Sequence, residues 1–171
     1  MTPAVAVVVP TYRRPALLLR CLTALAAQRL PYALFEVIVV DDGRTPETFT
    51  VIETVRGRHP GFTVKLIDPP AHARGPAAAR NAGWQSCEAP VIAFTDDDTI
   101  PARDWLTEGL RALTPEVAAV WGHVMVPLSP APSDYELSIK RMEGAPFLTA
   151  NCFVRRDALA DLKEMLKEKL I

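Results

Sequence analysis

AVAVVVPTYR, residues 4–13, is the stretch that decides the fold. Residues 4–9 form a continuous valine-rich run that stops at Pro10, which is typical of a strand buried on both faces of a sheet. A helix is expected over residues 15–29, because Pro15 suits a first helical turn and apolar residues recur there at helical spacing. The polar residues that follow the run therefore stand at the carboxyl end of a buried strand.

The same strand-then-helix pattern repeats along the chain. Further strands are predicted at 35–40, 63–67, 91–94 and 117–121, with helices at 46–57, 75–87 and 103–113. Strands that alternate with helices at this spacing form βαβ units, so we expect an α/β fold with a mostly parallel central sheet. A loop at 126–133, a short helix at 135–142, a strand at 151–154 and a helix at 157–171 complete the chain. No long linker divides it, which predicts a single domain over 1–171.

Composition excludes several classes of protein. Hydrophobic residues make up 49% of the 171 residues, which is enough for a sizeable core and rules out a largely disordered chain. The net charge of -1 provides no global field for nucleic acid, so no nucleic-acid partner is expected. The scattered cysteines Cys21, Cys87 and Cys152 form neither a disulfide framework nor a thiolate zinc motif. No apolar run is long enough to span a bilayer and no signal peptide is evident, so we expect a cytoplasmic protein.

Three predicted strands end in polar clusters: residues 10–13, 41–43 and 96–98. In an open parallel sheet, ligands bind outside the carboxyl ends of the strands, so these clusters should converge on one site. Asp96, Asp97 and Asp98 repel one another unless a cation neutralises them, and oxygen ligands suit Mg²⁺ or Mn²⁺. The alternative for this cluster is a solvated acidic turn that caps the next helix.

The other clusters also have two interpretations. Asp41-Asp42-Gly43 is either an ordinary turn or a carboxylate pair that accepts hydrogen bonds from a nucleobase or a ribose. Tyr12 either stacks on a base or packs locally. The alanines of residues 75–81 indicate close packing of a helix on the sheet, whereas Arg80 among them offers a planar fork for phosphate or carboxylate. Neither a Walker A loop nor GxGxxG is present.

Together these motifs resemble family-2 glycosyltransferases. VVVPTYRR at 7–14, VVDDG at 39–43, GPAAARNAG at 75–83 and FTDDD at 94–98 occur in that family's order, and TANCFVRR at 149–156 is similar to its later acceptor-side segment. The resemblance implies a GT-A fold, a Rossmann-like three-layer α/β/α arrangement. It also implies a nucleotide-diphosphate-sugar donor, with UDP favoured, and Mn²⁺ or Mg²⁺. The acceptor is unknown: a saccharide, a lipid or a small molecule.

The resemblance also assigns roles to individual residues. It implies that the nucleotide contacts Pro10, Thr11, Tyr12, Arg13, Asp41, Asp42, Arg80, Asp96 and Asp97. Asp98 is the expected direct metal ligand, and Asp96 the second ligand or a ribose contact. The cation would stabilise charge on the departing diphosphate. Inverting members of the family use a carboxylate to deprotonate the acceptor hydroxyl.

The catalytic base does not follow from the sequence. The family carries an acidic motif some way after a segment like 151–156, whereas residues 157–171 resemble a plain amphipathic helix. We therefore expect residues 126–171 to be an incomplete acceptor side, in either a truncated chain or a natural short form. Glu143, Asp134 and Asp157 are the substitutes considered for the base.

Two alternatives to a working transferase remain open. One is a non-catalytic nucleotide-sugar-binding domain, whose uncovered apolar surface would favour self-association. The other is a nucleotidyltransferase that makes the activated sugar. The absence of glycine from residues 10–14 disfavours the second alternative, because such enzymes carry a glycine-rich loop after the first strand.

Overall fold

A computed structural model describes residues 2–72 and 74–168, and its centre is a six-stranded sheet. The strands are β1 (Val5–Thr11), β2 (Phe35–Asp41), β3 (Val64–Ile67), β4 (Val91–Phe94), β5 (Ala119–Trp121) and β6 (Cys152–Arg155), in the order β3-β2-β1-β4-β6-β5. β1 pairs in parallel with β2 and β4, and β2 with β3. β6 lies between β4 and β5 and runs antiparallel to both. The predicted mostly parallel sheet is confirmed.

The helices follow the predicted order closely. They are α1 (Pro15–Ala26), α2 (Pro46–Arg58), α3 (Pro76–Gln85), α4 (Trp105–Ala112), α5 (Asp134–Lys140) and α6 (Arg156–Glu168), with short 3-10 turns at Tyr32–Leu34 and Arg141–Gly144. α1, α2 and α3 each begin with proline, whose fixed φ suits a first helical turn. Residues 169–171 of the predicted last helix lie outside the described residues. Within the described part of the chain, no helix combines the length and apolarity needed to cross a membrane.

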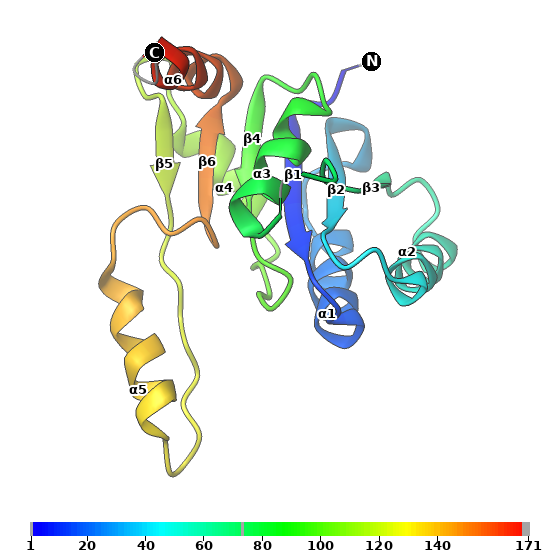
Figure 1. Ribbon diagram of the computed structural model, residues 1–171, viewed down its shortest axis with the longest axis vertical. Helices are drawn as coiled ribbons and strands as arrows, with labels where there is room; N and C mark the ends of the chain where they lie inside the picture. Colours follow the sequence, from blue (N-terminus) through cyan, green and yellow to red (C-terminus); the bar gives the residue numbers. More distant parts are fainter. Residues whose placement is uncertain (1, 73, 169–171) are drawn as a thin grey trace.

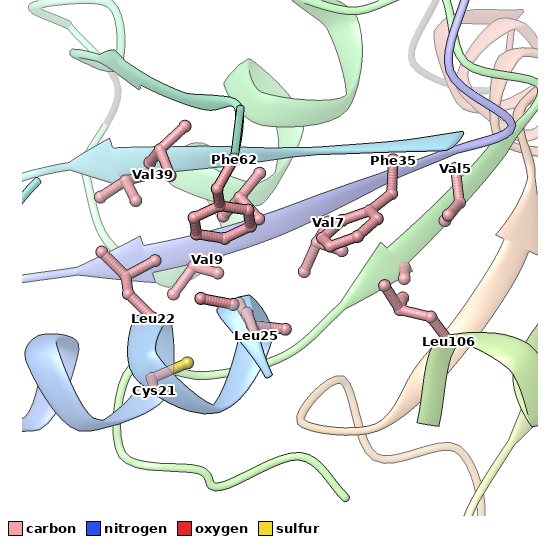
Figure 2. Packing of buried hydrophobic residues seen from close by; sticks show 14 of the residues in the cluster. Val5, Val7, Val9, Cys21, Leu22, Leu25, Phe35, Val39, Phe62 and Leu106 are labelled. Carbon is pink, nitrogen blue, oxygen red and sulfur yellow. The ribbon is translucent and has the colours of Figure 1, made fainter. Parts of the chain in front are cut away.

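The side chains of β1 point alternately to the two faces of the sheet, and helices cover both faces. Val5, Val7 and Val9 join one buried cluster, in which α1 supplies Leu18, Cys21, Leu22 and Leu25 (Figure 2). Ala6 and Val8 join a second buried cluster, which includes residues of α3. α1, α2 and α4 therefore cover one face of the sheet and α3 and α6 the other, which is the three-layer α/β/α arrangement that the resemblance implies. Burying a leucine of this kind contributes about 1.5–3 kcal/mol.

Residues 122–151, which we call the arm, leave the sheet between β5 and β6 and project away from it (Figure 1). The arm contains α5, whose first turn is closed by a capping box between Ser133 and Glu136. Its two ends are joined where the Gly122 amide donates to the Asn151 carbonyl, 3.1 Å away. Phe94 is paired with Cys152, so the arm leaves the same sheet edge at which β1, β2 and β4 end.

Candidate functional site

A pocket of about 480 Å³ lies at the carboxyl ends of β1, β2 and β4. It brings together all three predicted clusters and the start of α3. Its lining consists of Pro10, Thr11, Tyr12, Arg14, Asp42, Gly75, Pro76, Ala79, Arg80, Asp96, Asp97 and Asp98. Among the predicted nucleotide contacts, Arg13 and Asp41 are not part of this lining. Arg14, which sequence reasoning did not select, is part of it.

Arg80 holds Asp96 on the α3 side of the pocket. Its Nη2 lies 2.5 Å from Asp96 Oδ1, and the two side chains are only 17% and 30% exposed. α3 delivers Arg80 one turn after the helix start, while alanine beside it allows close packing against the sheet. Arg80 Nε is buried and has no hydrogen-bond partner among the described residues. Arg80 contacts Asp96 through Oδ1, so the other carboxylate oxygen, Oδ2, is not part of this ion pair.

Asp97 is the buried member of the acidic cluster, at 5% exposure. The Thr11 hydroxyl donates to its Oδ2 over 2.7 Å, which ties the end of β1 to the end of β4. Burial raises the pKa of Asp97 above its ordinary value of 3.8, while the Thr11 hydrogen bond and the Arg14 charge oppose that shift. Asp97 is therefore placed to support the pocket floor.

Asp98 lies at the mouth of the pocket with a side chain 53% exposed. Arg14 Nη1 lies 3.6 Å from Asp98 Oδ2 and 3.7 Å from Asp97 Oδ1. The three carboxylates are thus partly neutralised by two arginines of the chain itself. Repulsion within the cluster, from which the sequence analysis inferred a cation, is therefore reduced before any cation binds.

Asp41 and Asp42 have different surroundings. Asp41 is buried, and its carboxylate accepts hydrogen bonds from the amides of Gly43 and Thr45, both at 2.8 Å. It therefore closes the loop before α2 and lies outside the pocket lining. Asp42 faces the pocket and accepts a 2.8 Å hydrogen bond from the Gly75 amide. Gly75 has a φ of +91°, a conformation that favours glycine.

Tyr12 and Arg13 form the outer edge of this region. Tyr12 lines the pocket and is 52% exposed, so its ring face is accessible from solvent. The Arg13 guanidinium lies 5.3 Å from the centre of that ring, outside the lining, and Arg13 has a φ of +54°. This distance is within the range of a cation–π contact between Arg13 and Tyr12.

The acidic cluster suits a cation that arrives with a ligand. Among the described residues, no group of three or more His, Cys, Asp or Glu side chains is arranged to hold a metal ion. Mg²⁺ and Mn²⁺ commonly bind to one or two carboxylates and complete their coordination with water and substrate phosphates. Asp98, with the oxygen of Asp96 that Arg80 leaves open, offers such a partial donor set. The residues present therefore fit a cation shared with a phosphate ligand.

The three substitutes for a catalytic base all lie outside the pocket lining. Glu143, in the arm, accepts from Lys140 Nζ at 2.7 Å and from the Val126 amide, and the Lys140 hydrogen bond lowers its pKa. Asp134 is an exposed residue of the first turn of α5. Asp157 is the second residue of α6, and the Arg156 amide before it donates to the carbonyl of Pro90, the residue before β4, at the opposite end of the strands.

Comparison with known proteins identifies the family. A sequence profile described as Glycosyl transferase family 2 matches residues 6–162. The chain belongs to this family. Glycosyltransferase AglE of Haloferax volcanii is 27% identical over 170 residues, which is 94% of this chain and 55% of AglE. The succinoglycan biosynthesis protein ExoM of Rhizobium meliloti is 33% identical over 94% of this chain and 54% of ExoM.

Solved structures agree with this assignment. The mannosyltransferase PcManGT from Pyrobaculum calidifontis, in complex with GDP-Man and Mn²⁺, superposes with a TM-score of 0.72 at 27% identity. The match covers 95% of this chain and 47% of PcManGT. S. aureus TarS 1-349 in complex with UDP-GlcNAc shares the fold, with a TM-score of 0.72 at 23% identity. This family-2 chain spans about half the length of AglE, ExoM and PcManGT.

Proposed function

We propose that the pocket binds a nucleotide-diphosphate sugar, with a UDP-sugar favoured, as the donor of an inverting glycosyl transfer. The observation that carries this proposal is the convergence of three separate strand ends on one pocket lined by Tyr12, Asp42 and the acidic cluster. Family membership supports it, and so do the GDP-Man and UDP-GlcNAc bound to PcManGT and TarS.

The lining residues divide into a nucleoside part and a phosphate part. Pro10, Thr11 and Tyr12 would line the base, and Tyr12 presents an exposed ring face for stacking. Asp42 would accept hydrogen bonds from the base or ribose while it keeps the Gly75 amide in place. Arg13 would act indirectly, through its contact with Tyr12. Asp41 would act indirectly too, by shaping the loop that carries Asp42.

The acidic cluster would serve the diphosphate. Asp98, with Asp96, would hold Mn²⁺ or Mg²⁺, and a bound cation supplies electrostatic stabilisation for the departing diphosphate. Arg80 keeps Asp96 in a fixed orientation, because it grips one carboxylate oxygen from a helix. Asp97 and Thr11 hold the ends of β1 and β4 together beneath the site.

The acceptor side would be formed by the arm, which leaves the same sheet edge. Thr95 follows β4 directly and donates to the Ala150 carbonyl over 3.0 Å, so the arm begins beside the acidic cluster. A saccharide, a lipid or a small molecule would approach there.

The second candidate function is a nucleotide-sugar-binding domain without turnover. The observation that favours it is the position of Glu143, Asp134 and Asp157, none of which lines the pocket. Hydrolysis or transfer assays separate the two functions, since only a transferase releases UDP from a UDP-sugar.

Calorimetric titration tests donor binding. UDP, UDP-GlcNAc and GDP-Man are titrated into the protein with Mn²⁺ and then with EDTA. We expect UDP binding that weakens at least about tenfold in EDTA and in Asp98→Ala, by loss of a direct cation ligand. Asp104→Ala removes an exposed carboxylate outside the pocket and should bind as wild type. Folded protein that binds no nucleotide diphosphate would contradict the proposal.

A further inference from the structure

Arg14 has no role in the proposed function, although it lines the pocket and faces the acidic cluster. A single atom, Arg14 Nη1, lies between two carboxylates: 3.7 Å from Asp97 Oδ1 and 3.6 Å from Asp98 Oδ2. One positive group thus occupies the space between two acidic side chains. A small cation that approaches Asp98 from this side has to compete with it.

The two arginines of the pocket differ in how firmly they are held. Arg80 is 17% exposed and lies 2.5 Å from its carboxylate partner. Arg14 is 55% exposed, and both of its carboxylate contacts are longer than a hydrogen bond. The contact with Asp98 joins two exposed side chains, and ion pairs of this kind are weak and easily exchanged. The contact with the buried Asp97 is the longer of the two, at 3.7 Å. Arg80 is therefore a fixed part of the cluster, whereas Arg14 is free to be exchanged.

A diphosphate gives the Arg14 side chain a better partner than the one it has. Guanidinium groups bind phosphate oxygens with two parallel hydrogen bonds, which are stronger than a long contact with a carboxylate. Arg14 precedes the first residue of α1, at the wall of the pocket, so a ligand that fills the pocket contacts it. Moving Arg14 onto phosphate uncovers Asp98 for a cation.

We propose that Arg14 is an internal counter-ion that keeps free divalent cations off Asp98 until a diphosphate draws its guanidinium away. This inference rests on the proposed donor site. It makes cation and nucleotide bind cooperatively, and the coupling is reciprocal: each ligand raises the affinity of the other by the same factor. Arg14 is a positioning residue here, because it acts through the carboxylates.

Titrations of Mn²⁺ into the wild-type protein and into Arg14→Gln, each with and without UDP, test this role. Electron paramagnetic resonance measures the free Mn²⁺ in each titration. We expect Arg14→Gln to bind Mn²⁺ alone about tenfold more tightly than wild type, because a competing charge is gone. UDP should bind more weakly to the variant, and the factor by which UDP tightens Mn²⁺ binding should fall to the part that comes from phosphate oxygens binding the cation directly. Arg20→Gln removes an exposed arginine of α1 outside the pocket and should match wild type.

Unchanged or weaker binding of Mn²⁺ alone to Arg14→Gln would overturn the role of Arg14, while UDP binding to wild type would still support the donor site. Absence of UDP binding in both wild type and Arg20→Gln would instead contradict the proposed function itself. Should Arg14→Gln not fold, Arg14→Met carries the same test, because it keeps the aliphatic stem and removes the charge. A thermal shift on adding Mn²⁺ alone, larger in the variant than in wild type, is the second readout.

Discussion

The sheet and the arm are stabilised in different ways. Every residue of β1 and β2 is buried, and helices cover both faces of the sheet. No described residue of the arm is buried, and several of its apolar side chains are exposed: Met125, Leu128, Leu137, Met142 and Phe147. The arm is held by local contacts, such as the capping box and the Lys140–Glu143 pair. The proposed donor pocket is therefore built on the part of the molecule that has its own core.

The largest effect that separates the two regions should come from two glycines. A Cβ at Gly83, in α3, would lie 2.3 Å from Val8 Cγ1 in the buried sheet, whereas a Cβ at Gly144, in the arm, meets nothing within 4 Å. We expect Gly83→Ala to lower the free energy of unfolding by about 2 kcal/mol through overpacking. Gly144→Ala should change it by less than about 0.5 kcal/mol. Urea denaturation measures both, and equal stabilities would show that α3 is packed more loosely than the structure indicates.

The fold could be predicted from the sequence because the sheet repeats one signal. Most strands are apolar runs, three of them end in polar clusters, and the covering helices bury apolar residues against the sheet, so local pattern and tertiary packing agree. The position of β6 between β4 and β5 did not follow from that signal. Its antiparallel direction depends on the path of the arm, in which exposed apolar residues carry no readable period.

The site was predicted only in part, because the contacts of the loops after the strands decide which carboxylates face the pocket. The pocket takes residues from both faces of the sheet, since the adjacent residues Pro10 and Thr11 both line it. The carboxylate of Asp41 is held by amides of its own loop, whereas Asp42, in the turn after β2, accepts from the Gly75 amide and lines the pocket. These loop contacts could not be read from the sequence. Arg14 was missed because its partners, Asp97 and Asp98, are more than eighty residues away along the chain.

Asp41 and Asp42 provide the next test, because Asp41 holds the loop before α2 together whereas Asp42 lines the pocket. Asp41→Ala leaves the amides of Gly43 and Thr45 without their acceptor, and we expect a loss of about 1–2 kcal/mol in the free energy of unfolding. Asp42→Ala should cost less stability and should weaken UDP binding more. Urea denaturation and calorimetry on the same two variants measure this, and the reverse ranking would assign Asp41 to the nucleotide.

The arm should show a pH response of its own. Hydrogen bonds from the Ser133 amide and hydroxyl lower the pKa of Glu136 to about 2, from an ordinary value of 4.5. A depressed pKa stabilises the folded form above the unfolded value, so α5 should lose this contribution as the pH falls from 4.5 through about 2. NMR chemical shifts of residues 134–140 measure it. The chemical-shift change near pH 2 should be absent in Glu136→Gln. A change that persists in this variant would come from another titrating group.

The smallest effect should come from removing the arm. Gly122 and Asn151 are already hydrogen-bonded across its base, so Asn-Gly in place of residues 123–150 can join the ends as a two-residue tight turn. No arm residue lines the pocket. Metal-dependent UDP affinity should therefore stay within about twofold of wild type, and the free energy of unfolding should not fall, because a shorter connection costs less entropy to close. A shortened protein that loses UDP binding would show that the arm shapes the donor site. Retained binding together with loss of any sugar transfer would assign the arm to the acceptor.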